Sequence, residues 1–176
     1  MNTALLIVDV QHALCSGAEA AFDIERVVER INGVSSQARA AGVPVFLVQH
    51  EEDVGALRFG SAGWQLDARL ATGGGDTRIR KTAPDAFEGT PLQALLAAGG
   101  IERLVVCGLQ TDCCIDATVR RAVALGHPVE LLTDAHSTVA SGGLSAVEII
   151  ARHNAALASL GPRVTPTTAT GVRLAT

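Results

Sequence analysis

The sequence predicts an α/β protein, a three-layer α/β/α sandwich with a mostly parallel central sheet. Short continuous runs of apolar residues recur along the chain, and such runs are typical of strands that are covered on both faces. Segments with the residue spacing of amphipathic helices lie between them, as in parallel sheets whose strands are joined by helical crossovers. Neither internal repeats nor low-complexity linkers interrupt this alternation. We therefore expect residues 1–176 to form a single domain.

The first part of the chain contains a strand, a helix and a second strand. Thr3–Val8 is a short apolar run and predicts the first strand. Asp23 is a plausible N-cap for a helix whose apolar residues follow at helical spacing up to Gly42, a residue type that commonly follows a helix end. Val43–Val48 predicts the second buried strand. This order is that of a βαβ unit with parallel strands.

A long irregular stretch follows the second strand. His50–Arg78 contains several glycines, and an excursion of this length inside a compact domain is usually functional or contacts a partner. Its only helical candidate is Gly63–Leu70.

The second half of the chain continues the alternation of strands and helices. Thr77–Lys81 is a weaker strand candidate, and a helix is expected over Thr90–Ala98, with Thr90 as its cap and Pro91 as its first residue. The remaining expected elements are a strand at Arg103–Cys107 that Gly108 ends, a helix over Ile115–Val123 up to Gly126, a strand at Pro128–Leu132, a helix at Ser145–Leu160 and an edge strand at Arg163 and Val164. The threonine-rich tail after about residue 165 is expected to be loosely held.

Composition excludes several classes of partner. Fourteen Lys and Arg against eighteen Asp and Glu give a net charge of −4, which offers no basic surface to nucleic acid or to an acidic membrane. Four Phe, one Trp and no Tyr leave few platforms on which bases could stack. No apolar run approaches the roughly 20 residues of a membrane span, and no signal peptide is recognisable, so we expect a cytoplasmic protein. Four cysteines without a C-x-x-C pair predict neither a zinc site nor a disulfide framework.

Residues suited to nucleophilic chemistry follow the predicted strands. In an open parallel sheet the ligand lies beyond the carboxyl ends of the strands. Asp9 ends the first strand, Lys81 is the only lysine and closes the third candidate, and Cys113 and Cys114 fall in the first turn of a helix. A thiol at a helix N-terminus is stabilised as thiolate, with the Asp as a possible base and the Lys as a balancing cation. Each residue alone could be structural, but the three types together favour catalysis.

Three segments occur in the order and spacing of a known family. They are LLIVDVQ at residues 5–11, RKTAPDAFEGTPL at 80–92 and VVCGLQTDCCIDATVRRAVALGHPVELLTDAHST at 105–138. With these segments the chain resembles, over nearly its whole length, the isochorismatase-like cysteine hydrolase family. That family includes nicotinamidases, N-carbamoylsarcosine amidase and ureidoacrylate-type amidohydrolases.

The resemblance implies a Cys-Asp-Lys triad with Cys114 as the nucleophile, Asp9 as the base and Lys81 as the cation. The family pattern is Gly-x-x-Thr-x-x-Cys followed by an aliphatic residue, and choosing Cys113 would break this register. The residues that satisfy it are Gly108, Thr111, Cys114 and Ile115.

The resemblance also implies a cis peptide bond between Leu109 and Gln110, and an oxyanion hole formed by the backbone N–H groups of Gln110 and Cys114. Four further residues are expected to contact the substrate, although each has a structural alternative in the core, at an interface or on the backbone: Gln11, Trp64, Phe87 and His136.

The expected site needs neither a metal nor another cofactor. Nicotinamidases of the family carry an Asp and several His around a metal after the second strand, whereas this chain has the single histidine His50 there. Leu14 stands where the family often has an aromatic residue, so one pocket wall is expected to be aliphatic.

The expected function is therefore metal-independent hydrolysis of C–N bonds in small amide, carbamoyl or ureido compounds through a thioester. One alternative is isochorismatase-type vinyl-ether hydrolysis, which needs no covalent nucleophile. Another is a non-catalytic binding protein or a redox-responsive one that uses Cys113 and Cys114. The resemblance also implies a homo-oligomer, either a dimer or a tetramer.

Overall fold

The computed structural model describes residues 1–167 and has a six-stranded sheet at its centre. The strands are β1 (Thr3–Val8), β2 (Val45–His50), β3 (Thr77–Lys81), β4 (Arg103–Leu109), β5 (Val129–Ser137) and β6 (Arg163–Thr165). Their order across the sheet is β3-β2-β1-β4-β5-β6, and every neighbouring pair is parallel. The predicted fold class is confirmed.

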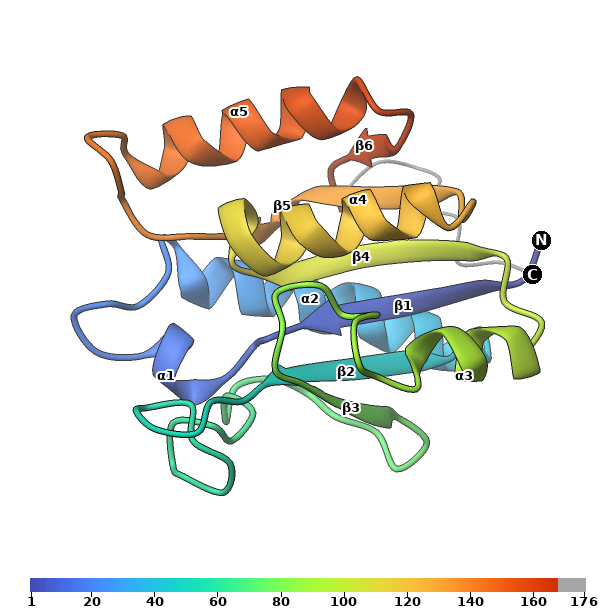
Figure 1. Cartoon of the computed structure of the whole chain (residues 1–176), viewed down its shortest axis with the longest axis horizontal. Coiled ribbons are helices and arrows are strands. Elements are labelled where there is room, and N and C mark those ends of the chain that lie inside the picture. The colour runs from blue at the N-terminus through green and yellow to red at the C-terminus, as the bar shows by residue number, and fades with distance from the viewer. Residues whose placement is uncertain (168–176) are drawn as a thin grey trace.

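Helices cover both faces of this sheet (Figure 1). α2 (Ile24–Ala40) packs on one face, while α3 (Leu92–Ala98), α4 (Asp116–Ala124) and α5 (Ala146–Ala158) lie on the other. Two short helical segments complete the set, α1 (His12–Cys15) and the π-helix η1 (Thr111–Ile115).

The central strand β1 shows why an uninterrupted apolar run marks a strand in this fold. All six of its residues are buried. Leu5 and Ile7 pack in the core on the α2 side, whereas Ala4, Leu6 and Val8 pack in the core beneath α3 and α4. Alternate side chains of a strand point to opposite faces, so burial on both faces favours apolar residues at every position. Thr3, at the start of β1, is its one polar residue.

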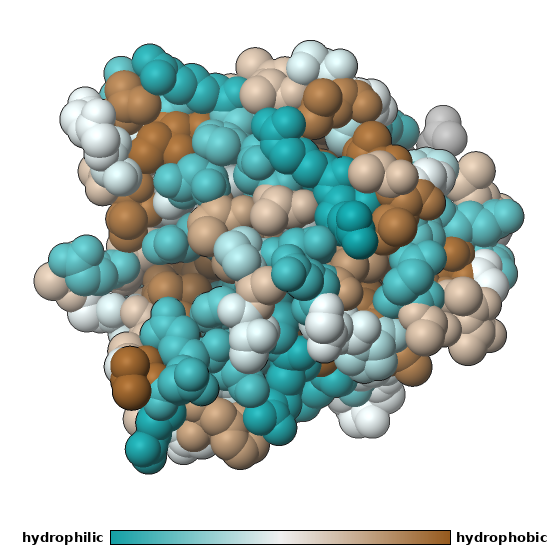
Figure 2. All heavy atoms as spheres, viewed as in Figure 1, coloured by the Kyte–Doolittle hydropathy of each residue, from teal (hydrophilic) through white to brown (hydrophobic). Residues whose placement is uncertain are grey.

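The surface is mainly polar on the face shown in Figure 2, where hydrophobic side chains lie in separate groups among hydrophilic ones. Within residues 1–167, no helix is long and apolar enough to cross a membrane.

Several strand boundaries differ from the expectation. β2 begins at Val45 instead of Val43, because the N–H of Val43 donates to the Ala38 carbonyl near the end of α2. The strand continues to His50. β4 passes through Gly108 to Leu109 because Gly108 adopts a φ of +120° and stays paired with β1. β5 continues to Ser137, five residues past the predicted end, after a register shift against β4.

The helix predicted at Gly63–Leu70 is wrong. The carbonyls of Gly63 and Gln65 accept the N–H groups of Ala13 and His12, and the carbonyl of Trp64 accepts two glutamine side chains. Distant groups therefore take the bonds that an α-helix would form locally, and the segment folds as turns.

Helix ends also differ in detail. α3 begins at Leu92, with Pro91 at the N-cap and the Thr90 hydroxyl accepting the Leu92 N–H at 3.2 Å. α5 begins at Ala146, one residue after the predicted start, and Ser145 caps it in a capping box with Glu148. It ends at Ala158, two residues earlier than predicted. α1 and the π-helical form of η1 were not expected.

Two threonines at the start of the expected tail are bonded to side chains of β5. Thr165 donates a hydrogen bond to Glu130 at 2.6 Å, and the N–H and hydroxyl of Thr167 both bond to the carboxylate of Asp134. The rest of the expected tail, residues 168–176, lies outside the described residues.

Candidate active site

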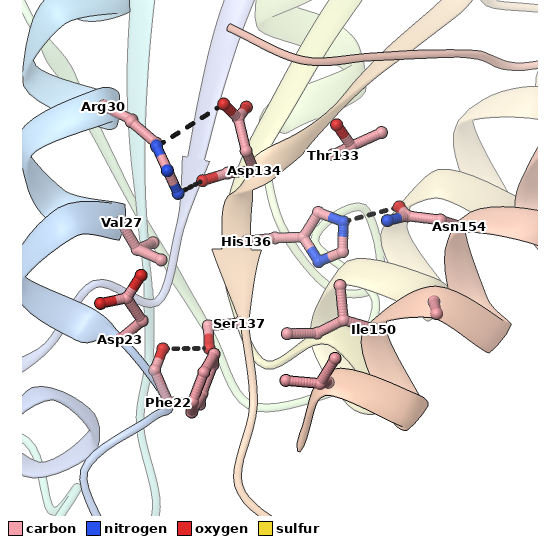
Figure 3. A pocket seen from close by; sticks show the side chains of 12 residues that line it. Phe22, Asp23, Val27, Arg30, Thr133, Asp134, His136, Ser137, Ile150 and Asn154 are labelled. Carbon is pink, nitrogen blue, oxygen red and sulfur yellow. Dashed lines mark hydrogen bonds and ion pairs between the residues drawn. The ribbon is translucent and has the colours of Figure 1, made fainter. Parts of the chain in front are cut away.

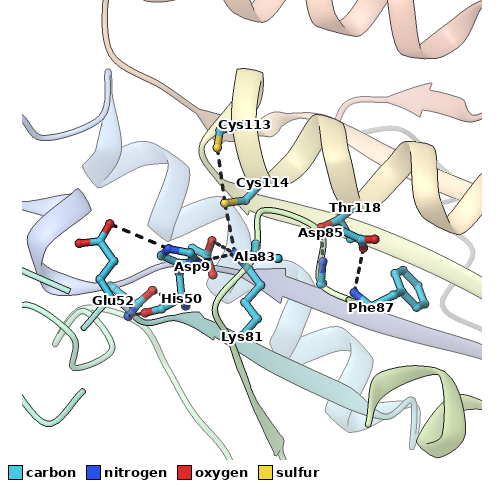
Figure 4. Close-up of polar contacts among 12 residues, drawn as sticks. Asp9, His50, Glu52, Lys81, Ala83, Asp85, Phe87, Cys113, Cys114 and Thr118 are labelled. Atoms are coloured by element: carbon cyan, nitrogen blue, oxygen red, sulfur yellow. Dashed lines mark hydrogen bonds and ion pairs between the residues drawn. The ribbon is translucent and has the colours of Figure 1, made fainter. Parts of the chain in front are cut away.

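Asp9, Lys81 and Cys114 meet beyond the carboxyl edge of the sheet (Figure 4). Asp9 follows β1, Lys81 ends β3, and Cys114 lies in η1, directly after β4. The Lys81 Nζ is 2.8 Å from Asp9 Oδ2 and 3.2 Å from Cys114 Sγ. The three residues are 0%, 2% and 8% exposed, so the charges of this cluster lie almost entirely out of water.

The backbone around the cluster departs from regular conformations. Asp9 has a φ of +51°, a left-handed conformation that non-glycine residues rarely adopt and that is concentrated at functional sites. The peptide bond between Leu109 and Gln110 is cis, as expected. The Gln110 carbonyl then accepts the N–H groups of both Cys113 and Ile115, which places Cys114 between them at the start of η1.

Burial sets the electrostatics of the cluster. Burial raises the pKa of Asp9, and the nearby charge of Lys81 only partly opposes this. Burial also raises the pKa of the Cys114 thiol, and the negative charge of Asp9 raises it further. For Lys81, burial acts to lower the pKa, but Asp9 and Cys114 outweigh it and the pKa is raised overall. The resting arrangement is an ammonium between a carboxylate and a neutral thiol.

The Asp9 carboxylate has unused acceptor capacity. Oδ2 makes the ion pair with Lys81, but neither oxygen has a hydrogen-bond donor in good geometry among the described residues. A buried carboxylate normally accepts several hydrogen bonds, because leaving its oxygens unpaired is costly. Asp9 can therefore accept a proton from a group that enters the site.

Lys81 has two more neighbours, the Ala83 carbonyl at 3.1 Å and His50 Nδ1 at 3.2 Å. An ammonium has only donors, so the ring nitrogen that faces it accepts, and we assign the ring proton to His50 Nε2. Nε2 faces the carboxylate of Glu52, whose Oε1 is 4.0 Å away.

The cluster opens into a cavity of about 230 Å³. This is below the usual size of drug-binding sites and fits a small substrate. Its lining residues are Asp9, Leu14, His50, Glu52, Leu57, Pro84, Gln110, Cys113 and Cys114. Leu14 provides the aliphatic wall that was expected. Sequence reasoning missed Glu52, Leu57 and Pro84; for Glu52 a signal existed, since it follows β2 by two residues.

None of the four residues expected to contact the substrate lines this cavity. The Gln11 side chain donates to the carbonyls of His50 and Trp64 at 2.9 and 2.8 Å and accepts the His50 N–H at 2.9 Å. Both the amide nitrogen and the amide oxygen of Gln11 are thus hydrogen-bonded to the loop of residues 50–64. The Trp64 ring packs edge-on against Phe59, with ring centroids 4.8 Å apart.

Phe87 and His136 lie farther from the cluster. Phe87 belongs to the core beneath α3 and α4, stacks on His127 and points away from the cluster in Figure 4. His136 is bonded to Thr111 Oγ1 at 2.8 Å and to Asn154 Oδ1 at 2.9 Å, so both of its nitrogens already have partners.

A second, larger cavity of about 270 Å³ lies between α2, β5 and α5 (Figure 3). Several of its polar groups are bonded to one another: Arg30 donates to the Asp134 carbonyl, and the Ser137 hydroxyl donates to the Phe22 carbonyl. Among its described lining residues there is no thiol and no carboxylate–lysine pair, so the smaller cavity is the chemically equipped one.

The cluster contains atoms that metals bind. Ligand atoms of Asp9, His50 and Cys114 lie within 4.8 Å of one another. Lys81 Nζ, however, is 2.8 to 3.2 Å from each of these residues. A divalent ion in their midst would be repelled by the ammonium, so the donor set does not fit a resident metal while Lys81 is in place.

Comparisons with known proteins show which family the chain resembles. The family model of the isochorismatase domain matches residues 3–170. A streptothricin hydrolase of Streptomyces noursei is 43% identical over 136 residues, which are 77% of this chain but 49% of the relative, so the chain spans about half the length of that protein.

Two other matches cover most of both chains. A ureidoacrylate amidohydrolase of Caulobacter vibrioides is 29% identical over 171 residues, with 76% of each chain covered. The crystal structure of an isochorismatase family protein superposes with a TM-score of 0.87 at 36% identity and covers 93% of this chain and 96% of its own.

Proposed function

Since the chain belongs to the isochorismatase family of hydrolases, we propose that it hydrolyses C–N bonds in small amide, carbamoyl or ureido compounds without a metal. Cys114 is the nucleophile, Asp9 the general base and Lys81 the cation that balances charge. The amidohydrolase named among the relatives supports this class of bond.

One observation carries the proposal. A buried carboxylate with free acceptor capacity, a buried ammonium and a buried thiol meet at one cavity. Burying charged groups costs several kcal/mol per ion, so a core would be at least as stable with apolar residues at these positions. A base beside a nucleophile is the arrangement that covalent catalysis requires.

The proposed reaction has two stages. Asp9 takes the thiol proton as Cys114 Sγ attacks the carbonyl carbon; the C–N bond then breaks, and the amine leaves with the proton that Asp9 returns. In the second stage Asp9 deprotonates a water that attacks the thioester, the C–S bond breaks, and the proton returns to Cys114. Lys81 keeps its proton throughout.

The negative oxygen of each tetrahedral intermediate needs donors. We assign this role to the backbone N–H groups of Gln110 and Cys114, two residues of the cavity lining at the start of η1. The ammonium of Lys81 lowers the cost of the charge that forms on Sγ.

Two alternatives are less well supported. Vinyl-ether hydrolysis has no need for a thiol beside a base, and Cys114 lies there. A redox role would join Cys113 to Cys114, whose sulfurs are 3.8 Å apart. Adjacent Cα atoms are about 3.8 Å apart, which is shorter than disulfides normally span, so this bond would be strained.

The test is ammonia or amine release from a panel of small amides, carbamoyl and ureido compounds. Cys114→Ala should lower turnover at least about a thousandfold, because the covalent route is lost. Cys113→Ser, which changes the neighbouring sulfur alone, should retain turnover within about tenfold. A chelator should have no effect.

Turnover that survives Cys114→Ala would rule out the assigned nucleophile. Loss of turnover on chelation, restored by added metal, would overturn the metal-free mechanism while leaving the substrate class in place.

We also propose that the protein forms a homo-oligomer, a dimer or a tetramer. Exposed apolar side chains such as Phe22 (49%) and Val147 (55%) support this. Light scattering coupled to gel filtration measures the mass directly, and a monomer at micromolar concentration would contradict it.

A further inference from the structure

We propose that Glu52 selects substrates that carry a positive charge, an ammonium or guanidinium group, at the end remote from the scissile carbonyl. This inference rests on the proposed function and concerns the same cavity. It assigns to Glu52 a role in specificity that is separate from the chemistry at Cys114.

The loop after β2 places Glu52 at the mouth of the cavity. The Glu52 N–H donates to the Leu57 carbonyl at 3.1 Å, and a backbone bridge to Arg58 closes the turn. At Gly55, which has a φ of +93°, a Cβ atom would lie only 3.3 Å from Glu52 Oε2. Glycine at position 55 therefore leaves room for the Glu52 carboxylate. The Glu52 side chain is 48% exposed at the cavity mouth.

Glu52 has no cationic partner from the chain. Among residues 1–167, no lysine or arginine forms an ion pair with it, and His50 Nε2 lies 4.0 Å from its Oε1. The preceding residue differs: both oxygens of Glu51 bond to the guanidinium of Arg80, at 2.7 and 2.9 Å. The chain thus neutralises Glu51 and leaves the charge of Glu52 at the cavity without a counterion.

The cavity as a whole has excess negative charge. Its lining includes the carboxylates of Asp9 and Glu52 but neither lysine nor arginine, and the ammonium of Lys81 behind it is paired with Asp9. Leu14, Leu57 and Pro84 supply apolar walls. A substrate whose carbonyl reaches Cys114, whose body contacts these walls and whose cation meets Glu52 would match every part of the lining; a terminal carboxylate would be repelled.

Charge-selective thiol reagents test this without knowledge of the natural substrate. The 2-aminoethyl, 2-hydroxyethyl and 2-sulfonatoethyl methanethiosulfonates are similar in size but cationic, neutral and anionic. Their rates of reaction with Cys114 are measured by mass spectrometry in a Cys113→Ser background and divided by their rates with a small free thiol. Cys15 and Cys107 are 2% and 0% exposed, and peptide mapping separates any reaction there.

The full chain should react faster with the cationic reagent than with the anionic one. Glu52→Gln should lower this cation-to-anion ratio by about three- to tenfold, since one charge near the thiol is removed, and Glu52→Lys should invert it. Asp53→Asn removes an equal charge from the next residue, which is exposed and does not line the cavity, and should leave the ratio nearly unchanged. A ratio that Glu52→Gln does not alter, or that Asp53→Asn alters as much, overturns the proposal.

A kinetic arm keeps this inference distinct from the proposed function. Linear primary amides that end in an ammonium, a hydroxyl or a carboxylate are compared by kcat/KM in the same variants. Equal turnover of all three, unchanged by Glu52→Gln, refutes the role of Glu52 while the hydrolase stands. If the unaltered protein hydrolyses none of these amides, the hydrolase is refuted. The cation-to-anion ratio of the thiol reagents then still decides whether Glu52 selects for cations.

Discussion

Burial acts on Asp9 and Cys114 in ways that suit a resting enzyme. A raised pKa makes the Asp9 carboxylate a stronger base than an exposed one, and general bases work best when their pKa approaches the working pH. The same burial keeps Cys114 protonated, and a neutral thiol reacts slowly with oxidants and alkylating agents. In the proposed mechanism the thiolate therefore forms only as Cys114 attacks the carbonyl of a bound substrate.

Asp9→Asn should separate two properties that depend on this carboxylate. Hydrolysis should fall by about 10²- to 10⁴-fold because the base is lost. Alkylation of Cys114 by iodoacetamide near pH 8 should become faster, because the negative charge that raises the thiol pKa is removed while Lys81 remains. Both rates are measured on one preparation, with Asp53→Asn as the control. Unchanged hydrolysis or slower alkylation would contradict the assignment.

At the scale of secondary structure, the junction of β1 and β4 tolerates no side chain at position 108. A Cβ atom built on Gly108 would lie 2.0 Å from the Val8 carbonyl oxygen, and the φ of +120° is also unsuited to other residues. This close approach brings the ends of β1 and β4 together, and with them Asp9 and the start of η1.

Gly108→Ala should destabilise the fold by more than about 4 kcal/mol, or prevent folding, because the clash is with backbone and cannot be relieved by rotating a side chain. Gly33→Ala is the matched control: Gly33 lies inside α2, with open space around the added methyl group, and should stabilise the protein by about 0.5 to 1 kcal/mol. Urea unfolding measures both. A Gly108→Ala protein with normal stability would show that the strands can separate here.

β1, which is buried on both faces, was predictable from its apolar run and has the predicted bounds. β3 also has the predicted bounds, although it lies at the edge of the sheet and only Ile79 and Lys81 in it are buried. The end of β5 was not predictable, because Thr133 and Asp134 are polar and the pairing with β4 resumes only after a register shift. The turns at Gly63–Leu70 have an apolar spacing that fits a helix, and only their partners in α1 and β2 exclude one.

The site was predictable where a side chain directly follows a strand. Parallel strands bring their carboxyl ends to one edge, so Asp9, Lys81 and the pair Cys113 and Cys114 could be placed together before any geometry was known. The choice of Cys114 over Cys113 came from the family resemblance. Which way a loop residue points has no such signal. Phe87 turns into the core, and Glu52 reaches the cavity only because its loop folds back on itself.

At the scale of the whole molecule, His136 joins three elements. Within β5 it is bonded to Thr111 of η1 and Asn154 of α5. Burial lowers its pKa to about 4, from an ordinary value of 6.5. Between these values the unfolded chain binds a proton at this histidine and the folded ring does not, so stability falls as the pH drops from 6.5 towards 4.

The expected loss over this window is about 3 kcal/mol, and the midpoint of thermal unfolding should fall accordingly. His136→Gln should flatten the pH dependence in this range, whereas His12→Gln, at an exposed position, should not. If the His136 variant keeps the slope of the unaltered protein, the acid sensitivity has another source.

The pairing of β1 with β4 also has a consequence for biosynthesis. Thr3 pairs with Arg103, about 100 residues further along the chain, whereas the other edge of β1 pairs with β2 after about 40. At roughly 5–20 residues per second, a ribosome needs roughly 5–20 s to supply the second partner. For that time the nascent chain has an apolar strand with one open edge, the kind of segment that molecular chaperones shield. Cys114 emerges just after β4, so Asp9, Lys81 and Cys114 can meet only after that strand has been made.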